Sequence, residues 1–302
     1  MYTVPDQTGR TFIVTGANSG TGKEATKRLA AAGAKVIMAV RTPPKGEDAR
    51  REILESVPGA DLEVRRVDLA DLASIREFAK GIVDEGIPVD VLVNNAGVMM
   101  PPKRYETADG FELQFGSNFL GPFALTMLLL PRILESANAR VTTMSSGLAN
   151  MGRIRFDDLN SQKTYRPTRA YAQSKLADML FAEQLADIAR ERGWSLRSTV
   201  AHPGFTRTNL QTAGRNLARP GQELPPIRRS VIPSQGVEQG AEPLLFAAAD
   251  PAAGQGEYFG PNRLGLVGPT KKVRLPRAAR RADVPAKLWG VAEELTGTQA
   301  PA

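Results

Sequence analysis

Short apolar runs and amphipathic segments alternate along most of the chain. The apolar runs are rich in β-branched residues, as in Thr11-Phe-Ile-Val-Thr15, and such runs are typical of buried strands. They occupy residues 11–16, 34–41, 62–69, 89–97, 139–146, 196–204 and 256–261. Strands that alternate with helical segments form βαβ units. The pattern therefore predicts an α/β fold with one doubly wound parallel sheet of about seven strands and helices on both faces.

No change of composition marks a linker, so residues 1–302 are expected to form a single domain. Within it, residues 205–234 mix arginines with prolines and are expected to cover a substrate pocket, and residues 270–302 form a C-terminal extension. The longest apolar stretch, residues 123–130, is too short to span a bilayer, and the N-terminus lacks the layout of a signal peptide. We therefore expect a soluble cytoplasmic protein without a membrane span.

The supply of metal-binding side chains is small. The chain has no cysteine and a single histidine, His202. Zinc sites draw mainly on these two residue types, so no metal site is expected and a zinc-dependent alcohol dehydrogenase is excluded. A Ser-His-Asp hydrolase is also disfavoured, because no Gly-x-Ser-x-Gly sequence is present and His202 directly precedes Pro203-Gly204.

The net charge is +7 and part of it lies in the basic segment 271–281. Clustered Lys and Arg can bind nucleic acid, but neither interleaved aromatic residues nor a nucleic-acid-binding motif accompanies them. We interpret the segment as a solvated tail that can attract anionic ligands, and we expect no nucleic-acid partner.

A glycine-rich turn follows the first predicted strand. Its sequence is Gly16-Ala-Asn18-Ser19-Gly20-Thr21-Gly22, and a good helix sequence comes next. Glycines at a strand-to-helix turn let the backbone approach a pyrophosphate, which then lies at the positive end of the helix. The spacing lacks the Gly-Lys-Ser/Thr ending of a P-loop, so it predicts a dinucleotide-binding turn of the Rossmann type.

Arg41, at the end of the second predicted strand, indicates which dinucleotide binds. A site for NAD(H) usually has an acidic residue here, which accepts hydrogen bonds from the ribose. Arg41 is instead a permanently charged donor suited to a 2′-phosphate, with Lys45 close by in the sequence. NADP(H) is therefore favoured over NAD(H).

Tyr171 and Lys175 carry the candidate chemistry. They are four residues apart in a helix-like segment, and such a pair lies on one helix face with Cβ atoms roughly 5–6 Å apart. At that distance the ammonium is expected to lower the pKa of the phenol from ~10 toward the range of a proton donor and acceptor at neutral pH.

Two other segments place polar residues near the expected site. Pro122 has no N–H, so the helix predicted over residues 111–136 loses its bond to the carbonyl of Asn118 and kinks there. Ser145 and Ser146 close a strand at its carboxyl end, where sheets of this kind bind ligands. One of the two hydroxyls is expected to bind a carbonyl oxygen of the substrate.

Together, six motifs of the chain resemble the short-chain dehydrogenase/reductase family. They are the glycine turn, Asn94-Asn-Ala-Gly97, Asn118, Ser145-Ser146, the Tyr171/Lys175 pair and His202-Pro-Gly204. These motifs occur in the family's order and cover nearly the whole chain. Arg41, the long gap from Ser146 to Tyr171 and the ending 287–297 are most similar to the retinol dehydrogenase and protochlorophyllide reductase group.

The resemblance implies roles for individual residues. It makes Tyr171, Lys175, Ser146 and Asn118 the catalytic set, with Asn118 holding a water that relays protons to Lys175. Ser145 and His202 are then structural, and the helices that carry Asn118 and Tyr171 pack against their copies in a homodimer or homotetramer. We expect the apolar faces for this contact to be formed by Leu125, Leu128 and Leu129 on one helix and Leu176 and Leu180 on the other. The expected cofactor contacts beyond the glycine turn and Arg41 are Asp68, Leu69, Asn95, Ala96, Gly97, Pro203, Gly204, Thr206 and Thr208.

The predicted activity is hydride transfer between the nicotinamide of NADP(H) and a small-molecule carbonyl or alcohol, with Tyr171 as the general acid and base. Two alternatives stay open. One is reduction of a carbon–carbon double bond by the same layout of residues, and the other is a protein that binds NADP(H) without turnover. The sequence does not identify the substrate.

Overall fold

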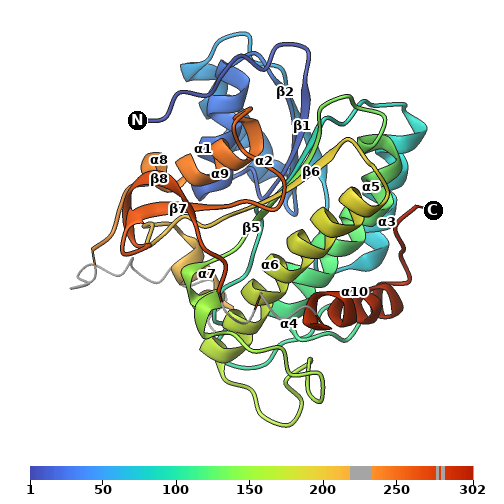
Figure 1. The fold of residues 1–302 in the computed structure, drawn as a ribbon. Helices are drawn as coiled ribbons and strands as arrows, with labels where there is room; N and C mark the ends of the chain where they lie inside the picture. Colours follow the sequence, from blue (N-terminus) through green and yellow to red (C-terminus); the bar gives the residue numbers. More distant parts are fainter. Residues whose placement is uncertain (218–232, 277–278, 280–282, 302) are drawn as a thin grey trace.

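The computed structural model describes residues 1–217, 233–276, 279 and 283–301. Its described residues form a sheet of eight strands in the order β3-β2-β1-β4-β5-β6-β7-β8 (Figure 1). All neighbouring strands are parallel except β7 and β8. The strands are β1 (Thr11–Thr15), β2 (Lys35–Val40), β3 (Leu62–Arg66), β4 (Val91–Asn94), β5 (Ala139–Met144), β6 (Leu196–Ala201), β7 (Tyr258–Arg263) and β8 (Val267–Val273).

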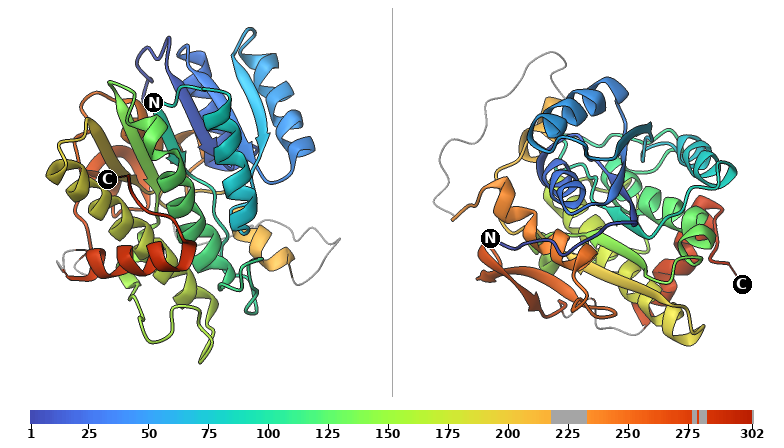
Figure 2. Two further views of the ribbon diagram at one scale, coloured as in Figure 1. Left: turned by 90° about the vertical axis from the view of Figure 1, so that its right-hand side faces the viewer. Right: turned by 90° about the horizontal axis from the view of Figure 1, so that it is seen from above.

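Helices cover both faces of the sheet (Figure 2). Side chains of a strand alternate between its faces, so Ile13 joins one hydrophobic cluster while Phe12 and Val14 join the other. The helical elements are α1 (Gly20–Ala31), α2 (Pro43–Ser56), α3 (Leu72–Asp84), α4 (Leu113–Phe115), η1 (Gly116–Leu120), α5 (Gly121–Ile133), η2 (Gly147–Met151), α6 (Pro167–Glu191), α7 (Leu210–Asn216), α8 (Val237–Gly240), α9 (Glu242–Ala249) and α10 (Asp283–Thr296). The predicted doubly wound fold is confirmed.

The order of the strands locates a ligand site. β1 lies between β2 and β4, so the crossovers from β1 to β2 and from β3 to β4 run in opposite directions along the sheet and open a crevice at the carboxyl end of β1. Several strands end earlier than the hydrophobic pattern predicts: β4 at Asn94, β5 at Met144 and β6 at Ala201. The residues that follow, including Asn95 and Ser146, are therefore free of the sheet ladder and line its carboxyl edge.

The eighth strand was not predicted. β8 pairs antiparallel with β7, and a tight turn at Leu264 and Gly265, both with positive φ, joins the two. A run with Gly, Pro and two lysines does not resemble a central strand, but these residues are common in edge strands. The interpretation of residues 271–281 as a tail is wrong for Lys271–Val273, which belong to β8. Residues 277, 278, 280 and 281 lie outside the described part.

The helix before the site contains a π-helical turn. α4, η1 and α5 run continuously from Leu113 to Ile133, and η1 is π-helical, with the Gly121 N–H donating to the Gly116 carbonyl. Pro122 cannot donate to Asn118, and the wider turn accommodates this missing bond. The predicted helix is thus present, with a π-turn instead of a simple kink. By length and composition it could cross a membrane, but 89% of its apolar window is buried within the protein, as in a core helix of a soluble protein.

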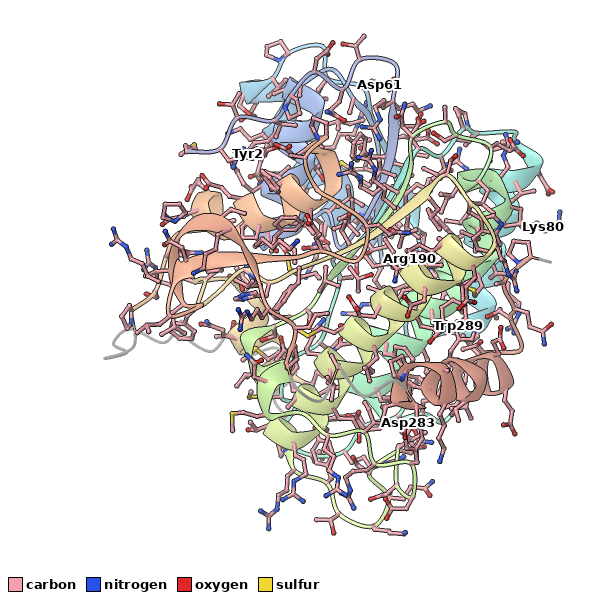
Figure 3. All side chains as sticks on the ribbon, in the orientation of Figure 1. Tyr2, Asp61, Lys80, Arg190, Asp283 and Trp289 are labelled. Carbon is pink, nitrogen blue, oxygen red and sulfur yellow. The ribbon has the colours of Figure 1, made fainter. Side chains whose placement is uncertain are left out.

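The helix faces proposed for dimer contacts are already covered. Leu125, Leu129, Leu176 and Leu180 are buried within the single chain, and Leu128 is half-buried against the same core. The expectation that these leucines form a spare apolar face is therefore wrong. Part of the covering comes from α10, whose Trp289 packs on rings of α5 and α6 (Figure 3).

Trp289→Ala is predicted to lower the free energy of unfolding by about 3–5 kcal/mol, the usual cost of removing a large buried ring. Trp289 lies edge-on to Phe123 at 5.0 Å and stacks on Phe181 at 5.9 Å between ring centroids. Denaturant unfolding measures the change. Met151→Ala is the control, because this side chain is 76% exposed and its removal leaves no cavity. Equal midpoints for the two variants would contradict the prediction.

Candidate active site

The glycine turn forms as predicted between β1 and α1. Gly16 and Gly20 have φ of 66° and 53°, a left-handed conformation that favours glycine. Gly22 is packed tightly, since a Cβ there would lie 2.4 Å from both the Gly16 carbonyl oxygen and Asn95 Nδ2. Asn95 fixes the turn by donating to the Thr15 carbonyl at 2.9 Å and accepting from the Thr21 hydroxyl at 2.9 Å. These contacts fix the conformation of the glycine turn, whose backbone a ligand can approach closely.

A cavity of about 580 Å³ opens at this turn. It extends from the glycine turn across the carboxyl ends of β1 and β4 to the start of α2, where Arg41 and Lys45 meet it. This size suits a small-molecule ligand, and Arg41 and Lys45 supply positive charge for phosphates at one end of the cavity. Of the predicted cofactor contacts, the cavity is lined by Gly16, Asn18, Ser19, Gly20, Thr21, Arg41, Asp68, Leu69, Asn95, Ala96, Gly97 and Thr208.

The residues after β6 have more varied positions. Thr206 is buried and its hydroxyl donates to the Pro203 carbonyl, so it points into the protein while Thr208 lines the cavity. A Cβ at Gly204 would lie 2.3 Å from the Leu266 carbonyl oxygen, which fixes the path of this loop. His202 is buried against Tyr258, and burial lowers its pKa to about 4. The interpretation of His202 as a packed polar residue is confirmed.

Part of the cavity wall was not predicted. α7, within the predicted cover segment 205–234, approaches the chain after β4 so closely that a Cβ on Gly214 would lie 1.9 Å from the Met99 carbonyl oxygen. Leu210 of this helix and Ser117 of η1 line the cavity as well. The sequence around Gly214 does not predict this contact, because it joins two segments that are about a hundred residues apart in the chain. Residues 218–232 of the segment lie outside the described part.

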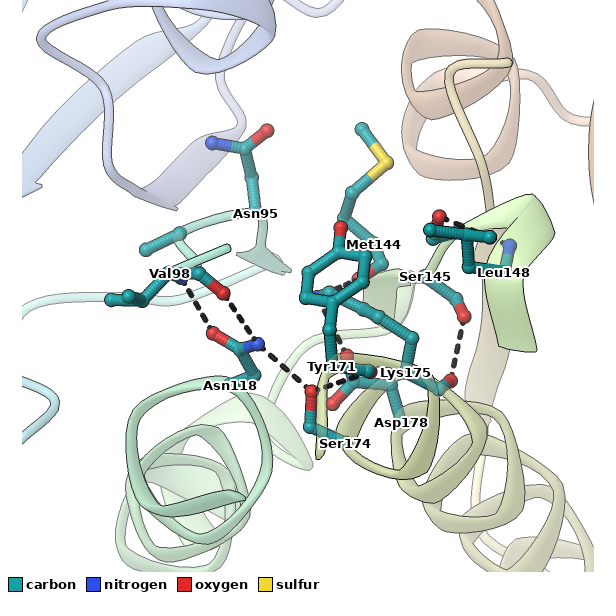
Figure 4. A network of polar contacts seen from close by, with 12 residues as sticks. Asn95, Val98, Asn118, Met144, Ser145, Leu148, Tyr171, Ser174, Lys175 and Asp178 are labelled. Atoms are coloured by element: carbon teal, nitrogen blue, oxygen red, sulfur yellow. Dashed lines mark hydrogen bonds and ion pairs between the residues drawn. The ribbon is translucent and has the colours of Figure 1, made fainter. Parts of the chain in front are cut away.

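Asn118 holds the loop after β4 against α6 (Figure 4). Its Oδ1 accepts from the Val98 N–H at 2.7 Å, and its Nδ2 donates to the Val98 carbonyl at 3.0 Å and to the Ser174 hydroxyl at 2.9 Å. A Cβ on Gly97 would lie 3.2 Å from Asn118 Oδ1 and 3.6 Å from Lys175 Nζ. Gly97 lines the cavity, so the cavity directly adjoins Asn118 and Lys175, two of the predicted catalytic residues.

Lys175 is held by two acceptors. Its ammonium donates to the Met144 carbonyl at the end of β5, at 2.9 Å, and to Asp178 Oδ2, at 2.8 Å (Figure 4). Ser145 donates to the Lys175 carbonyl at 2.7 Å, which joins β5 to α6 and agrees with its predicted structural role. Asp178 was not among the predicted site residues.

Tyr171 lies on the same face of α6 as Lys175 (Figure 4), and the Ser146 side chain is near enough to lower the pKa of its phenol. Burial raises the pKa of Tyr171 above its ordinary value, Lys175 and Ser146 lower it, and Asp178 raises it; the net direction is upward. The predicted net lowering of this pKa is therefore wrong in this structure, because burial and Asp178 outweigh Lys175. The phenol form, which is a proton donor, is favoured.

Comparisons with known proteins agree with this geometry. A sequence model of the short chain dehydrogenase family matches residues 10–217. The chain belongs to the short-chain dehydrogenase/reductase family. Within the family it falls in the retinol dehydrogenase-like group: mouse retinol dehydrogenase 12 is 38% identical over 291 residues, covering 96% of this chain and 87% of that protein.

Solved structures show the same fold. An uncharacterized protein from Mycobacterium paratuberculosis is 40% identical, with a TM-score of 0.81, and the match covers 99% of this chain and 97% of that one. A protein from Beutenbergia cavernae, described as an NAD(P)-dependent gluconate 5-dehydrogenase with bound NADP, is 27% identical, with a TM-score of 0.62. That match covers 84% of this chain and 95% of the other.

Proposed function

We propose that the protein is an NADP(H)-dependent oxidoreductase that interconverts a carbonyl compound and an alcohol. The observation that carries the proposal is the Tyr171 phenol, which lies near Ser146 and is placed with Lys175 beside a cavity whose glycine turn fits a dinucleotide. A bound nicotinamide would supply the hydride for reduction and accept it in oxidation. The chain's own residues then have to orient the substrate and move one proton.

The side chains divide these tasks. In reduction, the carbonyl oxygen accepts a hydrogen bond from Ser146, and Tyr171 gives it a proton while the carbonyl carbon receives the hydride. The O–H bond of Tyr171 breaks and leaves a phenolate, which the Lys175 ammonium stabilises. Asn118 fixes Val98 and Ser174 around them. The relay water at Asn118 stays a prediction.

A screen of aldehydes, ketones and alcohols with NADP(H), followed by nicotinamide absorbance, tests the proposal. Turnover of a carbonyl or alcohol is expected. Turnover only of substrates with an activated carbon–carbon double bond would favour the alternative reductase. Tight binding of NADPH without turnover of any compound would favour the non-catalytic protein, although that protein would have no need of Ser146 and Tyr171.

Arg41→Asp is predicted to weaken NADPH binding by roughly 10- to 100-fold, because it replaces a charge-assisted contact to the 2′-phosphate with repulsion. NADH, which lacks that phosphate, should lose little. Arg41 lines the cavity and is exposed, so its substitution should not disturb the fold. A bound NADP in the Beutenbergia cavernae protein also supports this choice.

Dissociation constants from fluorescence titration measure the change. Arg51→Asp is the matched control, since it reverses the same charge on α2 at a residue that does not line the cavity. A natural protein that binds NADH more tightly than NADPH would refute the cofactor proposal.

The assembly and the location of the protein are also proposals: we propose a cytoplasmic homodimer or homotetramer. Light scattering at micromolar concentration measures the assembly, and cell fractionation measures the location.

A further inference from the structure

Asp178 forms a buried ion pair with the catalytic lysine. It follows Lys175 by three residues on α6, and the two side chains are only 1% and 4% exposed. The same spacing recurs at the surface of α6, where Asp187 pairs with Arg190 in solvent. Taking two charges out of water costs free energy that their attraction often does not repay. Stability alone therefore does not explain why an acid stands beside Lys175.

The Asp178 carboxylate is bound to Lys175 through one of its two oxygens. Oδ2 accepts from Lys175, and within the described part of the chain Oδ1 is buried without a hydrogen-bond partner. Met144 binds a second ammonium proton through its carbonyl. The Lys175 ammonium is thus bound by one neutral and one negative acceptor, and the negative one reduces the effect of its charge on the Tyr171 phenol.

Three titratable groups interact here, and the described elements around α6 add no further charge to them. Burial lowers the pKa of Lys175 while Asp178 and Tyr171 raise it, with a net upward direction. Burial raises the pKa of Asp178 to about 7, against the opposing effect of Lys175. Charged groups on neighbouring elements have other partners: Arg140 of β5 donates to the Ala247 carbonyl, and Lys287 of α10 lies over the Phe156 ring.

We propose that Asp178 is a positioning residue that biases the site toward carbonyl reduction. It draws the Lys175 ammonium toward itself and offsets its charge, so Tyr171 stays a phenol that can donate a proton. This inference rests on the proposed oxidoreductase function and adds the direction to which the site is adapted. The natural substrate class is then an aldehyde or ketone, and the reductant is NADPH.

The sign of the effect follows from the charges. An ionised Asp178 disfavours a phenolate nearby, so removing its charge should lower the pKa of Tyr171. Carbonyl reduction needs the phenol and declines as pH rises through this pKa; alcohol oxidation needs the phenolate and rises through it. Burial raises the pKa of Asp178, so its negative charge, and with it any difference between the two proteins, should grow as pH rises.

The test compares natural protein with Asp178→Asn, which keeps an oxygen that can accept from Lys175 but removes the charge. The midpoint of the alkaline decline in kcat for reduction should fall by on the order of one pH unit, which lowers the reduction rate about tenfold above both midpoints. The rise of alcohol oxidation should move down by the same amount. Asp187→Asn, the same change on the exposed face of α6, should leave both profiles in place.

A second readout does not depend on turnover. NMR of the protein carrying isotope-labelled tyrosine follows the titration of Tyr171 directly, and its midpoint should fall in Asp178→Asn and not in Asp187→Asn. Unmoved NMR and kinetic midpoints in Asp178→Asn, even with a lower kcat, would overturn the inference and mark a purely structural role. A lowered NMR midpoint in a protein that reduces no carbonyl would support the charge effect while refuting the proposed function.

Asp178→Ser is the second variant, because Ser is also uncharged and can accept from Lys175; it carries the same expectation. If neither variant folds, the inference is overturned, since the ion pair would then be required for the fold itself. These outcomes separate a residue that sets the proton state of Tyr171 from one that only supports α6.

Discussion

Tyr171→Phe is expected to lose at least ~10²-fold in kcat, the lower end of what a positioned acid contributes. The substitution removes the only atom that can give the carbonyl oxygen its proton in the proposed mechanism. Phenylalanine keeps the aromatic ring, which is buried, so the fold and the cavity should change little. The dissociation constant for NADPH should therefore stay close to that of the natural protein.

Steady-state kinetics with the best substrate, together with NADPH titration, check this result. Tyr258→Phe is the matched control: it removes a buried phenol oxygen from β7 and lies beside His202, away from the Lys175 network. Near-normal turnover in Tyr171→Phe would mean that another group donates the proton.

Lys175→Met is expected to lower kcat by at least ~10²-fold, because the phenolate left by Tyr171 loses its nearest cation. NADPH binding should weaken as well, since Lys175 adjoins Gly97 at the cavity wall. The variant also leaves Asp178 buried without a cation. Burial then raises the pKa of this carboxyl above its unfolded value without the opposing effect of Lys175, so the folded state loses stability as pH rises above about 4.

Kinetics and urea unfolding at several pH values measure both effects. The double variant Lys175→Met/Asp178→Asn should recover stability at high pH, because it removes the unpaired carboxylate, but it should not recover kcat. Lys80→Met, which changes an exposed lysine, is the control for stability (Figure 3). Recovery of activity in the double variant would contradict the role given to Lys175.

The features that depend on local sequence were predicted well. The glycine turn between β1 and α1 needs only a strand, three glycines and a helix, and Gly16 and Gly20 have the expected backbone conformation. Tyr171 and Lys175 share a helix face because four residues make about one turn. Asp178 lies three residues from Lys175 on the same helix, but the exposed pair of Asp187 and Arg190 has the same spacing, so spacing alone does not identify the buried ion pair.

Features that depend on distant contacts were missed. The net pKa of Tyr171 is set by how deeply α6 is buried, which spacing along one helix does not reveal. The contact of Gly214 with Met99 and the pairing of β8 with β7 join residues through the tertiary fold. The leucines of α5 and α6 were predicted to contact a partner chain. The sequences of these two helices do not show that α10 packs against them in the same chain.

Transfer of an isotope label tests the central claim most directly. NADPH deuterated at C4 of the nicotinamide is incubated with the natural protein and a carbonyl substrate, and the product is analysed by mass spectrometry and NMR. Deuterium on the carbinol carbon, with the hydroxyl proton from solvent, is the predicted result; Tyr171→Phe should slow the transfer at least ~10²-fold. Deuterium on a carbon of a former double bond, or absence of transfer to every carbonyl that binds, would contradict it.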